Sequence, residues 1–226
     1  MFGKRFVLFE ILGFKVQIDG SWLFLAVLVT WSLATGVFPV WYEGLSPATY
    51  WWMAVAGVIG LVFSLIFHEL SHSLVARRFG LPIRGITLFI FGGVAEMEEE
   101  PASGKVEFLM AVAGPVSSCV LAVGFYVLAV IGLAQGLPDP VLGILDYLAL
   151  INGMLAAFNL LPAFPLDGGR MLRAALWYYK GDLREATRLA SRSGEIFGIV
   201  LMALGAVVTS AGAEDFEAPE ELAAEA

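Results

Sequence analysis

The sequence WWMAVAGVIGLVFSLIFHELSHSLVARRFG, residues 51–80, joins a long apolar run to the chain's two histidines. His68 and His72 lie four residues apart, with Glu69 between them. A run of about 20 apolar residues is long enough to cross the hydrocarbon core of a membrane as a helix. Ionisable side chains inside such a span are costly, so three of them together indicate a functional site.

The composition of the whole chain also indicates a membrane protein. Its 226 residues are 59% hydrophobic and 15% charged, with a mean hydropathy of +0.82, whereas soluble domains average about 45–50% apolar and about 25% charged residues. The net charge of −8 argues against nucleic acid as a partner. The single cysteine, Cys119, excludes an intramolecular disulfide, and its apolar surroundings predict a buried small hydrophobic residue.

Five stretches are long and apolar enough to span a membrane: residues 21–42, 51–78, 106–135, 141–161 and 194–212. They predict a single membrane core over residues 1–212. The acidic tail that follows, residues 213–226, is expected to be disordered.

The distribution of basic residues predicts the orientation of these spans. Three Lys and Arg residues precede the first span, four lie between the second and third, and six lie between the fourth and fifth, which accounts for all 13. If the spans alternate in direction, every basic residue lies on one side, and the positive-inside rule makes that side cytoplasmic. We therefore expect a multi-pass protein of the cell membrane with a cytoplasmic N-terminus.

Two segments have the character of β-strands rather than helices. FKVQID (14–19) alternates apolar and polar residues, and ITLFIFGGVA (86–95) is β-branched and aromatic with a Gly-Gly break. An open sheet edge is not tolerated against lipid, so these strands should lie at the interface or cover a cavity in the protein. The expected fold class is an all-α polytopic membrane protein, with about five to six transmembrane helices and a small membrane-associated β-sheet.

The spacing of His68 and His72 predicts a metal site. Positions i and i+4 of a helix lie on one face, so both imidazoles can bind one ion. HExxH is the zinc-protease pattern, in which the glutamate handles the proton of the attacking water. A buried polar cluster without catalytic function is the plain alternative. Haem ligation fits poorly, because two histidines one turn apart on one helix cannot reach opposite faces of a haem.

The chain has no third histidine, so a third ligand must be a carboxylate or Cys119. Asn159 lies as far into the fourth span as the two histidines lie into the second. Eight residues later Asp167 follows, in NLLPAFPLDGGR (159–170). A helix broken at membrane depth is tolerated where it lines a cavity, which makes Asp167 the predicted third ligand.

The residues around Asp167 predict how the chain turns there. Pro162 and Pro165 should end the fourth span, because proline interrupts helical hydrogen bonding. Gly168 and Gly169 should let the backbone turn tightly after the aspartate.

With these motifs in hand, the sequence resembles the site-2 proteases, the intramembrane zinc metalloproteases. The similarity extends over nearly the whole chain, to about residue 210. It is carried by four segments in the family's order: FHELSHSLVARRFG (67–80), FGGVAEMEEEP (91–101), EFLMAVAGP (107–115) and FNLLPAFPLDGGRMLRA (158–174).

The resemblance implies an activity and a role for each motif residue. His68, His72 and Asp167 would bind one Zn²⁺ per chain, Glu69 would be catalytic, and Asn159 would line the site and stabilise the oxyanion. The strand near the Gly-Gly break would border the active site and align an extended substrate by strand addition. The implied function is hydrolysis of peptide bonds in transmembrane substrate proteins near the cytosolic face.

Some features differ from the family or leave alternatives open. Members often add a sixth span and a cytoplasmic nucleotide-sensing domain, whereas an acidic tail follows the fifth span here. Ser118 stands where asparagine is common, and Asn152 could either supply a second amide or pack between helices. A non-catalytic protein with structural zinc and a metal transporter are the rival function classes. A transporter would need polar residues along its whole path, and the spans are nearly free of charge outside the motif.

Overall fold

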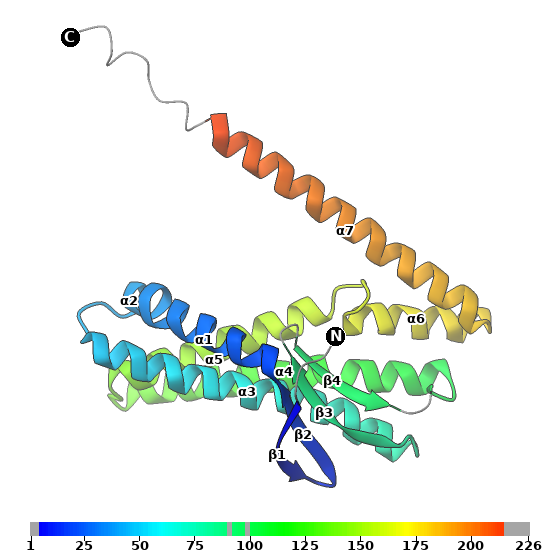
Figure 1. Ribbon diagram of the computed structural model, residues 1–226, viewed down its shortest axis with the longest axis horizontal. Helices are drawn as coiled ribbons and strands as arrows, with labels where there is room; N and C mark the ends of the chain where they lie inside the picture. Colours follow the sequence, from blue (N-terminus) through cyan, green and yellow to red (C-terminus); the bar gives the residue numbers. More distant parts are fainter. Residues whose placement is uncertain (1–4, 90–91, 98–99, 215–226) are drawn as a thin grey trace, which may run out of the picture.

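The computed structural model describes residues 5–89, 92–97 and 100–214 of the chain. Long helices lie side by side and carry a small sheet on one flank (Figure 1). The predicted fold class, a helical polytopic membrane protein with a small sheet, is confirmed.

Five helices in the described residues are long and apolar enough to cross a membrane. They are α1 (Gly20–Ser32) with its continuation through η1 (Leu33–Val37) and α2 (Phe38–Trp41), α3 (Pro47–Arg78), α4 (Gly104–Ala134), α5 (Asp139–Asn159) and most of α7 (Leu183–Glu214). Their outer surfaces are apolar: Trp52 is 74% and Val27 70% exposed. Side chains of this kind, exposed over whole helices, suit contact with lipid.

The fifth helix begins at Leu183, well before the predicted start near residue 194. The carboxylate of Asp182 accepts hydrogen bonds from the backbone N–H groups of Arg184 and Glu185, at 2.8 and 3.1 Å. A capping aspartate satisfies the free donors of a first turn, so the helix starts in the polar segment. Of the predicted acidic tail, residues 213 and 214 end α7, and residues 215–226 lie outside the described part.

Helix α3 is the centre of the bundle and contacts α1, α4 and α5. Ser46 caps its first turn and Pro47 occupies its first helical position, both of which favour helix initiation. A Cβ on Gly57 would lie 3.2 Å from the ring of Tyr147 on α5, so this glycine allows the two helices to approach closely.

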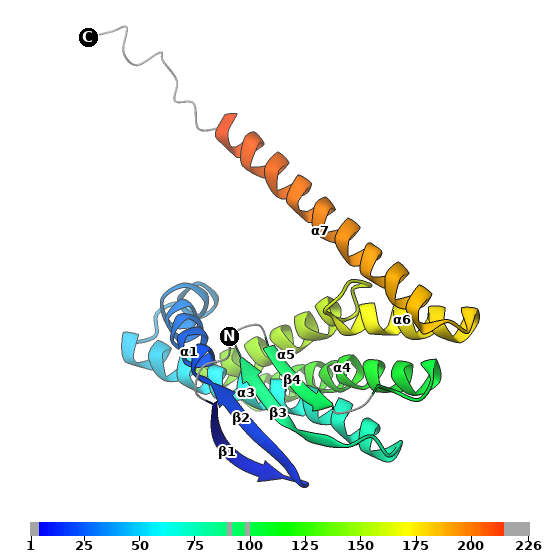
Figure 2. The ribbon, with the colours of Figure 1, turned by 45° about the vertical axis from the view of Figure 1, so that its right-hand side comes forward.

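The sheet has the order β1-β2-β3-β4. β1 (Arg5–Ile11) and β2 (Phe14–Asp19) form an antiparallel hairpin, β2 pairs with β3 (Ile83–Phe89) in parallel, and β3 pairs with β4 (Gly92–Met97) antiparallel. Figure 2 shows β3 and β4 close to the long helices and β1 farthest from them. The strand that ends the sheet next to the helices is therefore β4.

The prediction of strands was correct for β2, which spans residues 14–19 as expected. The predicted strand 86–95 is instead parts of β3 and β4, and residues 90 and 91 between them lie outside the described part. β1 was missed, because its sequence RFVLFEI does not alternate and all seven residues are exposed. Pairing with β2, across a turn in which Leu12 and Gly13 have positive φ, makes it a strand.

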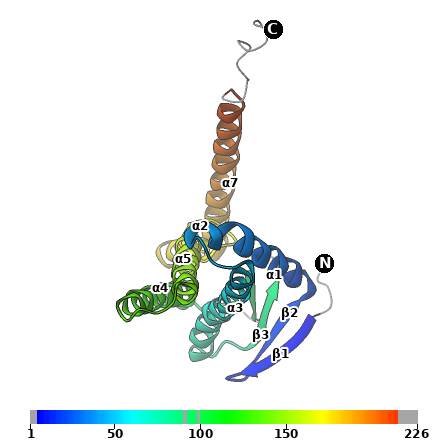
Figure 3. The same ribbon diagram turned by 90° about the vertical axis from the view of Figure 1, so that its left-hand side faces the viewer.

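Seen along the long helices in Figure 3, α7 projects away from the rest of the bundle. It leaves from α6 (Asp167–Lys180), a helix that was not predicted. Cys119 of α4 was predicted to be buried and is exposed instead. An apolar run fits a lipid-facing side as well as a protein core, so hydrophobicity alone could not assign its direction.

Candidate active site

The two histidines lie side by side on one face of α3, as their spacing predicted. His68 is 3% and His72 5% exposed, and their ring centroids are 4.9 Å apart. The apolar run before them keeps α3 helical through the motif, so the i, i+4 relation is preserved.

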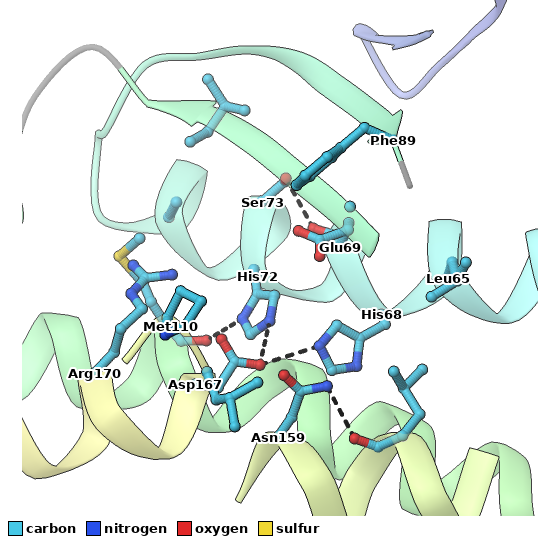
Figure 4. Close-up of a pocket in the computed structure, with 16 residues that line it drawn as sticks. Leu65, His68, Glu69, His72, Ser73, Phe89, Met110, Asn159, Asp167 and Arg170 are labelled. Carbon is cyan, nitrogen blue, oxygen red and sulfur yellow. Dashed lines mark hydrogen bonds and ion pairs between the residues drawn. The ribbon is translucent and has the colours of Figure 1, made fainter. Parts of the chain in front are cut away.

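Asp167 meets these histidines from a different part of the chain. Its Oδ2 atom lies 3.1 Å from Nε2 of His68 and 3.1 Å from Nε2 of His72 (Figure 4). One ligand atom from each of the three residues lies within 4.8 Å of the other two. The structure therefore brings together the three residues that the sequence predicted as metal ligands.

The route to Asp167 differs in part from the prediction. Helix α5 ends at Asn159, shortly before the predicted end of the span at residue 161, and Asp167 is the first residue of α6 rather than part of a turn. Gly168 and Gly169 lie in the first turn of this helix, where a Cβ would strike the backbone of Leu160–Leu161 and Ala163–Phe164. The glycines are needed for close backbone approach, which fixes the position of Asp167.

Groups on α4 fix the orientation of both imidazoles. His72 Nδ1 donates to the carbonyl oxygen of Met110 at 2.7 Å, and His68 Nδ1 shares a hydrogen bond with Ser118 Oγ at 2.8 Å. A carbonyl can only accept, so Nδ1 of a neutral His72 carries the proton and its Nε2 presents a lone pair. Partners of this kind orient metal-binding histidines.

The donor set fits a divalent cation. The Nε2 lone pair of a neutral His72 faces the Asp167 carboxylate, and two acceptors at 3.1 Å need a positive charge between them. Gly114 of α4 leaves the space for it, since a Cβ there would lie 2.5 Å from His68 Nε2 and also contact His72 Nε2. Two imidazoles and a carboxylate are a usual ligand set for catalytic zinc.

The charge state of Asp167 suits this role. Burial opposes ionisation of its carboxyl group, but when no cation is bound, protonated imidazoles of His68 and His72 would donate hydrogen bonds to it, and these bonds and charges outweigh burial and hold the pKa of Asp167 below its usual range. The carboxylate is therefore ionised and able to bind a cation.

Glu69 lies in the same cavity, which has a volume of about 460 Å³. Its side chain is directed to the side of the sheet, where Phe89 and Gly93 line the cavity (Figure 4). A Cβ on Gly93 would lie 2.9 Å from Glu69 Cδ, so the glycine lets the β4 backbone pass directly over the carboxylate. The sheet thus borders the site.

Asn159 lines the cavity, whereas Asn152 does not. The Asn159 amide donates one hydrogen bond to Leu155 O at 2.9 Å, which leaves its second N–H for another acceptor. Asn152 is fully buried and donates to Ser64 Oγ of α3 at 2.8 Å. The interpretation of Asn152 as a residue that packs between helices is confirmed.

Sequence reasoning missed several residues of the site: the partners Met110 and Ser118, the space-making Gly114, and Arg170. Ser118 was noticed only as a departure from a pattern. Met110 acts through its backbone and Gly114 through a missing side chain, so neither has a signal in the residue type alone. Arg170 is adjacent to the Asp-Gly-Gly motif, and its proximity was the one available signal.

Comparisons with known proteins found a matching family model and similar curated proteins. The family model of peptidase family M50 matches residues 56–142 and 134–204. The chain is 40% identical over 203 residues to putative zinc metalloprotease Rip3 of Mycobacterium tuberculosis and 37% identical over 198 residues to putative zinc metalloprotease sll0528 of Synechocystis. These alignments cover 90% and 88% of this chain and 51% of each relative, so the chain spans about half the length of the curated relatives it matches.

A solved structure has the same fold. The site-2 protease from Methanocaldococcus jannaschii superposes with a TM-score of 0.63 at 29% sequence identity. The superposition covers 91% of this chain and 87% of that chain.

Proposed function

Because the chain belongs to peptidase family M50, we propose that it is an intramembrane zinc metalloendopeptidase that hydrolyses peptide bonds of transmembrane proteins. One observation carries this proposal. The two imidazoles of α3, a helix able to span a membrane, converge within 4.8 Å with the carboxylate that begins α6, and Glu69 shares their cavity.

We assign His68, His72 and Asp167 as the ligands of one zinc ion per chain. Bound zinc supplies two effects, a lower pKa for a water molecule and polarisation of a carbonyl group. The Met110 carbonyl and the Ser118 hydroxyl hold the two imidazoles with Nε2 directed at Asp167. This rigid support reduces the cost of positioning the ligands.

We assign Glu69 as the general base and acid. It takes a proton from the attacking water and returns it to the leaving amine, a role that contributes about 10²–10⁴-fold in rate. Asn159 has an N–H not used by Leu155 and would donate it to the developing oxyanion. Removal of one such donor costs about 2.7–4 kcal/mol in comparable sites.

The substrate would bind as an extended strand along β4. This strand ends the sheet order among the described strands, so one of its edges is available for pairing. Gly93 places the β4 backbone directly against Glu69, which would bring a paired strand to the base. A helical substrate must unwind to pair in this way, so substrates should have helix-weakening residues near the cut.

The cut would lie near the cytosolic face. His68 and His72 follow Trp51 by 17 and 21 residues, which places them about 25–32 Å from the outer end of the span at 1.5 Å per residue. The orientation rests on the one-sided distribution of Lys and Arg, which also makes the N-terminus cytoplasmic. A protease-sensitive N-terminal tag that is cut only after permeabilisation of cells would support this orientation, and a tag cut in intact cells would refute it.

Glu69→Gln tests the function. Zinc content and hydrolysis of fluorescein-labelled casein, an unfolded probe, would be measured on detergent-purified, zinc-loaded protein. We expect about one zinc per chain in both proteins and at least about 100-fold slower hydrolysis by the variant. A zinc-loaded wild type without hydrolysis would favour a structural metal instead.

The substrate proposal is tested with a synthetic single-span peptide. The peptide carries Gly-Pro in its cytosolic half, and a matched peptide has leucine at both positions. Faster cleavage of the Gly-Pro peptide is expected, and equal rates would refute the unwinding requirement.

A further inference from the structure

Arg170 is a cationic side chain in the active-site cavity that has no role in the assignments above. It lies on α6 one turn after Asp167 and lines the cavity. Its Nη2 atom is buried and has no hydrogen-bond partner in the part of the chain that the structure describes. In Figure 4 its side chain extends from α6 past Met110 towards α3.

The next arginine on the same helix is in the opposite situation. Arg173 Nε donates to Glu107 Oε1 at 2.7 Å, its Nη2 contacts the same oxygen, and its guanidinium lies 5.6 Å from the centre of the Phe164 ring. Glu107 is fully buried on α4, so this pair holds α6 against α4. Arg173 therefore supports the structure, whereas Arg170 retains an unused buried donor.

A buried donor without a partner is costly, and the cost is largest for a charged group. Among the described residues that line the cavity, only Glu69 and Asp167 are acidic. The two carboxylates of the cavity, Glu69 and Asp167, already have assigned roles. Among the described residues, no acceptor remains for Arg170 Nη2, and the bound substrate chain is the acceptor that we consider.

We infer that Arg170 donates a hydrogen bond to an oxygen of the bound substrate chain. The contact would lie one turn of α6 after the zinc ligand Asp167, towards the C-terminal end of α3. This inference rests on the proposed peptidase function. An extended peptide presents carbonyl oxygens at regular intervals, and a strand paired with β4 crosses the cavity that Arg170 lines. Either a backbone carbonyl or an acidic side chain supplies the required oxygen.

The planar guanidinium explains the residue type. Arginine stays ionised in apolar surroundings and presents several donors in a fixed geometry, whereas lysine is a flexible point charge. Arg170→Lys should therefore restore only part of the function that Arg170→Met removes.

The test compares the zinc-loaded wild-type protein with Arg170→Met in detergent, with fluorescein-labelled casein as the substrate. Arg188→Met, which removes the same charge from an exposed position on α7, is the matched control. We expect unchanged zinc content in both variants, and a kcat/KM lowered about 10- to 100-fold only in Arg170→Met. In the inactive Glu69→Gln background, the affinity for labelled casein should fall only with Arg170→Met.

Mass spectrometry of the casein fragments identifies the oxygen. Uniform loss at all cut sites indicates a backbone carbonyl, and loss confined to sites with a nearby Asp or Glu indicates a carboxylate. Unchanged kcat/KM and unchanged casein affinity in Arg170→Met would overturn the inference. Loss of zinc from Arg170→Met would also overturn it, because Arg170 would then be a positioning residue for Asp167. A wild type that binds zinc but cuts no casein would refute the proposed function. The casein-binding assay in the Glu69→Gln background would still test whether Arg170 contacts the bound chain.

Discussion

Replacing Gly114 with alanine places a methyl group beside the two imidazoles of the site. The new Cβ would lie 2.5 Å from His68 Nε2 and in contact with His72 Nε2. Real Cβ atoms essentially never approach other heavy atoms closer than 3.0 Å, so His68 Nε2 or the α4 backbone must move by at least 3.0 − 2.5 = 0.5 Å.

This displacement is large compared with what a metal site tolerates. Zinc–imidazole bonds are about 2.0–2.1 Å, and working sites keep them within about 0.2 Å. A forced shift of 0.5 Å is about 2.5 times that tolerance, and the methyl group also takes up space between the ligands. We expect zinc affinity to fall at least about 100-fold, the upper range for loss of a group that supports metal ligands.

The assay is zinc stoichiometry of the purified variant, by elemental analysis, after dialysis against buffered free zinc. Gly124→Ala is the matched control, because it lies on the same helix and a Cβ there has nothing within 4 Å. Both changes raise helix propensity by about 1 kcal/mol, so destabilisation of α4 cannot explain a difference between them. Full zinc occupancy in Gly114→Ala would refute the placement of the metal next to α4.

Two other changes test the supports of the site. Ser118→Ala removes the hydrogen bond to His68 Nδ1 and should lower zinc affinity about 10- to 100-fold. Competition with a fluorescent chelator measures this affinity, and an unchanged value would contradict the orienting role of Ser118. Glu107→Ala removes the carboxylate that pairs with Arg173 and should destabilise the protein by about 3–5 kcal/mol. Thermal unfolding in detergent measures this loss. An unchanged melting temperature would show that the pair does not hold α6 against α4.

Residue type and spacing were sufficient for much of the protein. Long apolar runs determine spanning helices, because a backbone in lipid must satisfy its hydrogen bonds within each segment. HExxH predicted the paired imidazoles, because helix geometry relates residues four apart whatever surrounds them. Asp167 could be predicted as their partner because Asn159 lies at the depth of the histidines, Asp167 follows it after two prolines, and a helix broken at that depth is tolerated only beside a cavity.

Other features depend on residues far apart in sequence, and only the tertiary structure decided them. β1 is a strand because β2 pairs with it, and Cys119 lies on the exposed side of α4 with Val116 and Val120, whereas Ser118 lies on the packed side. Gly168 and Gly169 have negative φ and serve close packing, although their residue type suggested a turn. Gly114, the Met110 carbonyl and Arg170 Nη2, which has no partner among the described residues, belong to the site through position alone. A missing side chain, a backbone oxygen and the surroundings of one nitrogen atom have no signature in a one-dimensional sequence.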